Sequence, residues 1–159
     1  MSSSDPNANL YRQIIMDHYT NPRRKGLNTA DPDYYTVRLK NPSCGDDVTV
    51  QVKLEDDTVR DVRHDGSGCS ICCSSASMMS ELLYGKSLSD AEYLISQFKL
   101  MISAEPCDED ALGEAVSLHG VSHVLPRVKC ASLAWTAAQD AIEREQQLPA
   151  ADKENETDD

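Results

Sequence analysis

The sequence predicts an α+β protein with a small three-stranded antiparallel sheet and helices packed on one face of it. Two observations support this fold class. One central stretch alternates apolar and polar residues with a period of two, as half-buried strands do, and the rest of the chain repeats apolar residues at helical spacing. The order of the elements is one helix, three strands and then helices only. Strands that follow one another through short turns pair as neighbours, so the sheet is expected to be a meander covered by helices.

The strands are expected between residues 34 and 64. The clearest is VTVQVKLED, whose apolar residues at positions 48, 50, 52 and 54 alternate with polar ones. A turn at EDDT then leads into VRDVRH, which returns as the hairpin partner. The segment YYTVRLK, residues 34–40, supplies the remaining strand.

Helices are expected on both sides of the strands. Residues 9–20 show helical spacing, and Asn21-Pro22 ends that helix. Residues 70–84 form the next helix, with Gly85 just beyond its last turn, where a left-handed conformation is common.

The C-terminal part is expected to be helical as well. Ser89 and Glu92 match a capping box at the start of a helix. Residues 104–125 are less regular, and an alanine-rich final helix covers roughly 127–145.

Length and composition place the chain among single-domain proteins with a real core. It has 159 residues, of which 40% are hydrophobic. We expect a flexible N-terminus at 1–8, one domain at 9–145 and a disordered acidic tail at 146–159.

Charge and termini limit the possible partners and location. The net charge of −12 disfavours binding to nucleic acid or to an anionic membrane surface. The start, MSSSDPNANL, has neither the basic region nor the apolar run of a secretory signal, and no later run is long enough to span a bilayer. The expected location is the cytoplasm.

The six cysteines need an explanation, because thiols stay reduced in the cytoplasm. Cys44 lies in the loop NPSCGDD between two strands, and Cys69 follows a glycine-rich GSG at the start of a helix. Cys130 is expected in the first turn of the last helix. Helix N-termini carry partial positive charge, which favours a thiolate over a thiol.

Together with Asp46, these three cysteines make a plausible tetrahedral ligand set for zinc or an iron–sulfur cluster. Their spacing alone leaves other interpretations open. The cysteines could be small buried hydrophobic residues, and Asp46 could be a turn residue.

The other cysteines are expected to lie outside this site. Cys69 and Cys72 form a C-x-x-C, which by itself suggests a zinc knuckle or a redox pair. Helical geometry, however, places Cys72 on the core-facing side and Cys73 on a flank beside serines. Cys107 lies in an acidic loop and has no evident role.

Tryptophan and histidine are expected to play structural or supporting roles. Trp135 is expected to anchor the last helix in the core. The four histidines are expected to be surface residues or neighbours of the site: His18, His64, His119 and His123.

Three segments carry a family resemblance: NPSCGDDVTV, GSGCSI with the following SSASMM, and RVKCASLAW. They resemble the scaffold family of iron–sulfur cluster assembly, which comprises IscU, SufU and the NifU N-terminal domain. The resemblance covers roughly residues 9–145 and is strongest to SufU. Lys129 occupies the position at which the IscU branch has a histidine ligand, and residues 104–125 look like an extra segment of SufU.

The resemblance implies a site and a function. The implied metal ligands are Cys44, Asp46, Cys69 and Cys130, the implied metal is zinc, and Arg127 matches an arginine beside the family's site. A SufU-type protein accepts sulfur from a pyridoxal-phosphate cysteine desulfurase of the SufS type, and the accepting thiol matches Cys44. Downstream iron–sulfur assembly proteins are then the next partners.

Two alternatives remain open. The first is a scaffold that assembles a 2Fe–2S cluster, or holds iron, on the same ligands. The second is a zinc-stabilised adaptor without sulfur chemistry. Lys129 argues against the first, because a protonated lysine cannot replace a histidine ligand. Pro126, directly before Arg127, departs from the family pattern and is expected to shift how that arginine approaches the site.

Overall fold

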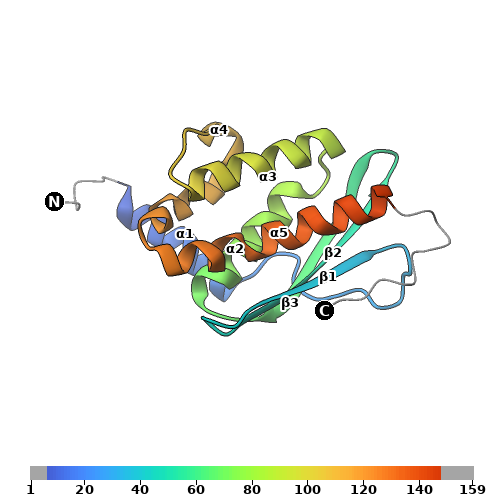
Figure 1. The fold of residues 1–159 in the computed structure, drawn as a ribbon, viewed down its shortest axis with the longest axis horizontal. Coiled ribbons are helices and arrows are strands. Elements are labelled where there is room, and N and C mark those ends of the chain that lie inside the picture. The colour runs from blue at the N-terminus through green and yellow to red at the C-terminus, as the bar shows by residue number, and fades with distance from the viewer. Residues whose placement is uncertain (1–6, 148–159) are drawn as a thin grey trace.

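The computed structural model describes residues 7–147 and confirms the α+β class. A three-stranded antiparallel sheet in the order β1-β2-β3 lies on one side of the molecule, and the helices cover one of its faces (Figure 1). The elements in chain order are α1 (Ala8–Thr20), β1 (Tyr35–Asn41), β2 (Asp46–Glu55), β3 (Thr58–Ser67), α2 (Ser70–Leu83), α3 (Leu88–Ile102), α4 (Glu109–Leu112), the 3-10 helix η2 (Gly113–His123) and α5 (Leu125–Gln147).

The period-two pattern produces the predicted sheet. Val50, at the centre of β2, pairs with Val37 on β1 and with His64 on β3. The β2–β3 hairpin turns at Asp56 and Asp57, which both adopt positive φ angles of 55° and 60°. Aspartate tolerates this conformation better than most residues, which suits a two-residue hairpin. The valines of the helix-facing side are buried: Val37, Val48, Val50, Val52, Val59 and Val62.

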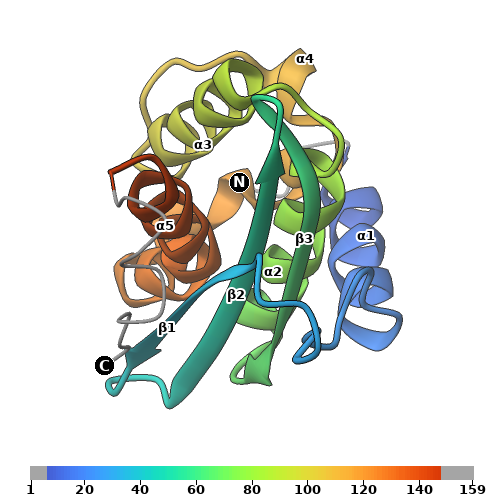
Figure 2. The same cartoon turned by 90° about the vertical axis from the view of Figure 1, so that its right-hand side faces the viewer.

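Helices α5 and α2 lie directly on the sheet, α5 against β1 and β2 and α2 against β3 (Figure 2). The predicted anchor role of Trp135 is confirmed, because this side chain is fully buried. Its ring stacks on Phe98 with centroids 4.1 Å apart, and its Nε1–H donates to Ser75 Oγ at 2.9 Å. Small side chains let α5 approach its neighbours closely, and five alanines of α5 are fully buried: Ala131, Ala134, Ala137, Ala138 and Ala141.

The start of α3 differs from the prediction. The helix begins at Leu88, and Ser87 is its N-cap, with Oγ accepting from the Asp90 N–H at 3.2 Å. The capping box predicted at Ser89 and Glu92 is therefore wrong. The Leu88 N–H donates to the carbonyl of Asp57 at 2.8 Å, so the β2–β3 turn fixes the chain just before the helix. Helix α2 ends as expected, with the following Gly85 at φ +80°.

The final helix begins earlier than the sequence suggests. Residues 109–123 form α4 and η2, and α5 starts at Leu125. Pro126 fits there because the first turn of a helix leaves its N–H groups without intrahelical partners. Cys130 is consequently the sixth residue of α5 and lies in its second turn, so the predicted first-turn position is wrong. The helix dipole stabilises a thiolate less at that depth, since its effect falls off within the first turn.

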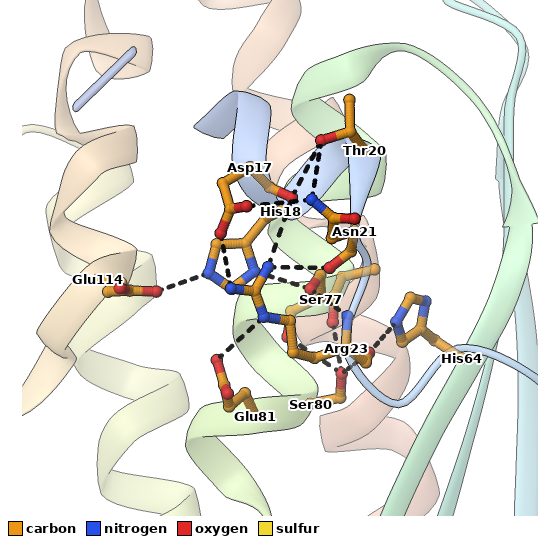
Figure 3. Close-up of polar contacts among 11 residues, drawn as sticks. Asp17, His18, Thr20, Asn21, Arg23, His64, Ser77, Ser80, Glu81 and Glu114 are labelled. Atoms are coloured by element: carbon orange, nitrogen blue, oxygen red, sulfur yellow. Dashed lines mark hydrogen bonds and ion pairs between the residues drawn. The ribbon is translucent and has the colours of Figure 1, made fainter. Parts of the chain in front are cut away.

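His18 was expected at the surface or beside the site, and the surface placement is wrong. His18 is fully buried, where α1 packs against α2 and η2 (Figure 3). Its Nδ1 lies 2.7 Å from Ser77 Oγ and its Nε2 lies 2.7 Å from Glu114 Oε1. The backbone N–H of Arg23 also donates to Ser77 Oγ, at 2.8 Å. The small Ser77 leaves room for the imidazole and supplies a polar partner for it.

His64 is buried as well, on β3 next to the segment that follows α1. Its Nε2 lies 2.8 Å from the carbonyl oxygen of Arg23, and burial lowers the pKa of the imidazole below its ordinary value. His119 is half-buried with its ring edge-on to Tyr11, and His123 is exposed, as expected.

Two further expectations concern the ends of the chain and membranes. The predicted loose N-terminus and acidic tail fall mostly on residues 1–6 and 148–159, outside the described residues. Among the helices of the described part, none is long and apolar enough to cross a membrane.

Candidate metal centre

Cys44 lies in the tight loop of residues 42–45 that joins β1 to β2. The backbone N–H groups of Cys44 and Gly45 both donate to the carbonyl of Asn41, at 3.2 and 2.9 Å. Gly45 has φ +77°, a left-handed conformation that glycine adopts without steric cost. The loop presents Cys44 as a half-buried thiol at the end of the sheet.

Asp46 is the first residue of β2 and is only 1% exposed. Its Oδ1 accepts a hydrogen bond from the Cys69 N–H at 3.0 Å, and its Oδ2 accepts one from Asn41 Nδ2 at 3.4 Å. A side chain at Gly68 would exclude this arrangement, because a Cβ there would lie 2.4 Å from Asp46 Oδ1. Asp46 is therefore a buried carboxylate with its own donors, as burial of a charged group requires.

Cys69 is the N-cap of α2, with extended backbone angles of φ −72° and ψ 168°. Its carbonyl accepts from the Cys73 N–H at 3.0 Å, the first bond of the helix. The predicted position of Cys69 at the start of a helix is confirmed, and its role as a ligand stays a prediction. Cys130, on α5, is fully buried, and its Sγ lies 3.7 Å from Asn41 Nδ2.

The fold brings three of the four predicted ligands into one tight group. The ligand atoms of Cys44, Asp46 and Cys130 all lie within 4.8 Å of one another. The Sγ atom of Cys69 is not part of that group, although its backbone N–H holds Asp46 and its side chain neighbours Cys130. Burial raises the pKa of the Cys130 thiol, and the adjacent side chains of Asp46, Cys44 and Cys69 raise it further.

The donor set fits a soft or borderline divalent metal ion. The group supplies two sulfur atoms and one carboxylate oxygen, and Cys69 would supply a third sulfur; Zn²⁺ accepts these ligand types in tetrahedral sites. Crowded, buried acidic groups resist ionisation when no positive charge is near, as the raised pKa of Cys130 illustrates. A divalent cation would reverse that preference, because its charge stabilises the thiolate form.

The remaining cysteines lie outside this group. Cys72 is 1% exposed in the core, and burial strongly raises the pKa of its thiol. Cys73 is half-buried, donates to the Gly68 carbonyl at 3.6 Å, and lines a cavity of about 410 Å³ together with Cys72 and His64. Cys107 is half-buried in the segment between α3 and α4. The burial of Cys72 in the core disfavours a C-x-x-C pair of Cys69 and Cys72.

Two basic residues flank Cys130 on α5. Arg127 lies in the first turn and Lys129 directly precedes the cysteine, and both are exposed. The backbone N–H of Arg127 donates to the Val124 carbonyl at 2.8 Å, which closes the junction between η2 and α5.

Asn41 is the site residue that sequence reasoning missed. It is the last residue of β1, 6% exposed, and stands opposite Asp46 in the strand register. The available signal was its position directly before the Pro/Gly loop, where a hairpin would place it across from Asp46.

A second group of possible ligands lies elsewhere in the described residues. Atoms of His18, Glu81 and Glu114 come within 4.8 Å of one another (Figure 3). Both carboxylates are about half exposed, and Arg23 Nε lies 4.0 Å from Glu81 while its Nη2 lies 2.6 Å from Asp17. We interpret this group as an ion-pair and hydrogen-bond network that joins α1, α2 and η2.

Comparison with known proteins places this chain in a family. The family model described as the NifU-like N terminal domain matches residues 10–149. The chain belongs to this family. Its membership agrees with the resemblance carried by the three cysteine-containing segments, each of which contributes one cysteine near the centre.

Several relatives of this NifU-like chain are known. It is 41% identical over 144 residues to a zinc-dependent sulfurtransferase SufU of Bacillus subtilis (strain 168), an alignment that covers 88% of this chain and 96% of the relative. It is 37% identical over 138 residues to an iron–sulfur cluster assembly scaffold protein IscU of Streptococcus pyogenes serotype M1, covering 85% and 84%.

The fold of this family member also matches solved structures. One is a proposed iron–sulfur cluster assembly scaffold protein for the SUF system from Fervidobacterium islandicum AW-1. It has a TM-score of 0.71 and 30% identity, and the match covers 82% of this chain and 94% of that one. The N-terminal part of a NifU-like protein from Brucella abortus has a TM-score of 0.77 at 21% identity and covers 89% and 98%, which supports the fold alone.

Proposed function

We propose that this chain is an iron–sulfur cluster assembly protein that binds zinc and accepts persulfide sulfur from a cysteine desulfurase. The proposed zinc ligands are Cys44, Asp46, Cys69 and Cys130. The observation that supports this most is the tight group of Cys44, Asp46 and Cys130 in a chain 41% identical to a zinc-dependent sulfurtransferase. The proposed sulfur donor is a pyridoxal-phosphate desulfurase of the SufS type, in the cytoplasm, and the proposed next acceptors are downstream iron–sulfur assembly proteins.

Cys44 is the proposed sulfur acceptor. It is half-buried in a short loop, whereas Cys130 and Asp46 are almost entirely enclosed. A partner's persulfide can therefore approach Cys44 without unfolding a helix or a strand. When bound, zinc would keep the thiols deprotonated and would add no redox chemistry of its own.

The transfer is a thiolate exchange. The Cys44 thiolate attacks the outer sulfur of the desulfurase persulfide, a new S–S bond forms at Cys44, and the desulfurase cysteine leaves as a thiolate. The transferred sulfur keeps its proton or loses it to water, so no external oxidant or reductant is required. The persulfide and the site are both anionic, and the exposed Arg127 and Lys129 supply positive charge close to Cys130. We propose Arg127 as the residue that assists this approach.

An alternative function uses the same residues. The Streptococcus pyogenes relative is named as a scaffold, which favours a protein that assembles a 2Fe–2S cluster or holds iron on these ligands. Lys129 disfavours this alternative, because its ammonium has no lone pair to offer a metal at neutral pH. A zinc-stabilised adaptor without sulfur chemistry would need the metal but not the accessible thiol of Cys44.

Two measurements test the proposal. Elemental analysis of anaerobically purified protein should find about one zinc per chain and little iron. Incubation with a SufS-type desulfurase and labelled cysteine should then place label on the wild type but not on Cys44→Ser, whereas Cys73→Ser should accept normally. Iron in place of zinc would favour the scaffold, and labelling that survives in Cys44→Ser would reject Cys44 as the acceptor. A zinc-loaded wild type that takes up no label would favour the adaptor.

A further inference from the structure

One buried residue, Asn41, contacts three of the four candidate ligand residues. It ends β1 and is 6% exposed. Its backbone carbonyl accepts from the Cys44 N–H at 3.2 Å, which fixes the loop that carries this thiol. Its side chain reaches Asp46 Oδ2 at 3.4 Å and Cys130 Sγ at 3.7 Å.

The side-chain amide is suited to both of its contacts. A carboxylate and a thiolate are acceptors only, so the NH₂ group of Asn41, with two hydrogens, faces them. The hydrogen-bonding partners therefore determine which end of the amide points into the site. One amide can donate to the carboxylate and to the sulfur at the same time.

Cys130 depends on this donor once it is ionised. Its other polar neighbours are the side chains of the candidate ligands, which are themselves acidic, and the Pro126 carbonyl, 3.8 Å from Sγ, which accepts a hydrogen bond from a thiol but repels a thiolate. Asp46 has a second donor in the Cys69 N–H. The amide of Asn41 thus offsets the repulsion between two like charges that a metal would bring together.

We propose that Asn41 is a positioning residue of the candidate metal centre: its amide holds Asp46 and Cys130 in a ligating arrangement, and its carbonyl fixes the Cys44 loop. The inference rests on the proposed metal binding. Outer partners of metal ligands typically contribute about 10–100-fold to metal affinity, and we expect an effect in that range for the amide of Asn41.

The test replaces Asn41 by leucine, which has a similar size, no side-chain donor and the same backbone carbonyl. Zinc affinity is measured by competition with a chromophoric chelator. Asn41→Leu should bind zinc about 10–100-fold more weakly than the wild type. In the cobalt-substituted protein, the thiolate-to-cobalt charge-transfer bands should shift, because the sulfur of Cys130 loses a hydrogen bond. A purely space-filling role would move neither readout.

Gln51→Leu is the matched control. Gln51 is a comparably buried amide, 5% exposed, on β2, and it hydrogen-bonds to Asn28 and Thr36 instead of to a candidate ligand. This variant should lower the melting temperature without changing zinc affinity or the cobalt spectrum.

The outcomes separate this inference from the proposed function. Wild-type zinc affinity and an unshifted cobalt spectrum in Asn41→Leu would overturn the role of Asn41. Absence of thiolate-to-cobalt bands in the wild type would reject the metal site itself. If Asn41→Leu does not fold, Asn41→Ala decides instead. It also lacks the side-chain donor, so wild-type zinc affinity and an unshifted cobalt spectrum in Asn41→Ala would overturn the inference.

Discussion

Replacing Gly68 by alanine should disrupt the candidate centre from outside its ligand set. An added Cβ would lie 2.4 Å from Asp46 Oδ1, 3.1 Å from its Cγ and 3.2 Å from its Cα. Ordinary contacts begin near 3.4 Å, so the carboxylate oxygen must retreat by about 1 Å. Asp46 is the buried first residue of a strand, so it cannot simply swing into solvent.

The expected magnitude follows from two losses. The hydrogen bond from the Cys69 N–H to Asp46, now 3.0 Å long, would be broken or strained, and a bond to a charged group is worth about 1.5–3 kcal/mol. Overpacking adds about 1–3 kcal/mol. Because the two terms overlap, we expect a loss of about 2–4 kcal/mol in the free energy of unfolding, which for a chain of this size lowers Tm by very roughly 5–15 °C.

The assay is urea unfolding of metal-free protein, combined with zinc competition against a chelator. Gly68→Ala should lose both stability and zinc affinity. Gly120→Ala is the control, because a Cβ at Gly120 would meet no atom within 4 Å. If Gly68→Ala matches Gly120→Ala in both measurements, the close approach of Gly68 to Asp46 has no energetic importance and the reasoning is refuted.

Three further predictions concern metal, thiols and pH. Chelation of the purified protein should lower its melting temperature by many degrees, because metal binding energy becomes folding energy. An unchanged melting curve after verified zinc removal would contradict this. The double variant Cys72→Ala with Cys73→Ser should keep about one zinc per chain and normal sulfur acceptance, whereas Cys69→Ser should bind zinc weakly. If the double variant loses zinc and Cys69→Ser keeps it, Cys72 or Cys73 is a metal ligand and Cys69 is not. Burial lowers the pKa of His64 below 6.5, so its contribution to stability is full above pH 6.5 and is lost as the pH falls through the lowered value. The melting temperature of metal-free His64→Gln should fall less steeply with acidification below pH 6.5, and parallel curves would exclude His64 as a source of the pH dependence.

Local patterns predicted the secondary structure well where each element carries its own signal. The three strands follow from alternating side chains and short turns, and α2 follows from helical spacing up to Gly85. The starts of α3 and α5 were predicted less well. A backbone hydrogen bond from Leu88 to Asp57 fixes the start of α3. The helical residues 109–123 lead the chain directly into the start of α5. Such contacts join residues that are distant in sequence, so no local pattern contains them.

The interior position of His18 shows the same limit. Its spacing on α1 is compatible with either a buried or an exposed side. Burial became favourable because Ser77 and Glu114, which are 59 and 96 residues away, provide a partner for each ring nitrogen. A polar side chain is buried without a large free-energy cost only where it finds hydrogen-bond partners. The tertiary structure determines where those partners lie.

The sequence by itself determined which residues could take part in the site. Loop and helix-start contexts pointed to Cys44, Cys69 and Cys130, and the ligand role of Asp46 rested mostly on the resemblance of three segments. Only the tertiary structure decided how these residues meet. The strand register sets Asn41 opposite Asp46, and the absence of a side chain at Gly68 lets α2 approach that carboxylate. Sequence patterns record the chemistry and local conformation of each residue, whereas distances between segments depend on how the sheet and helices pack.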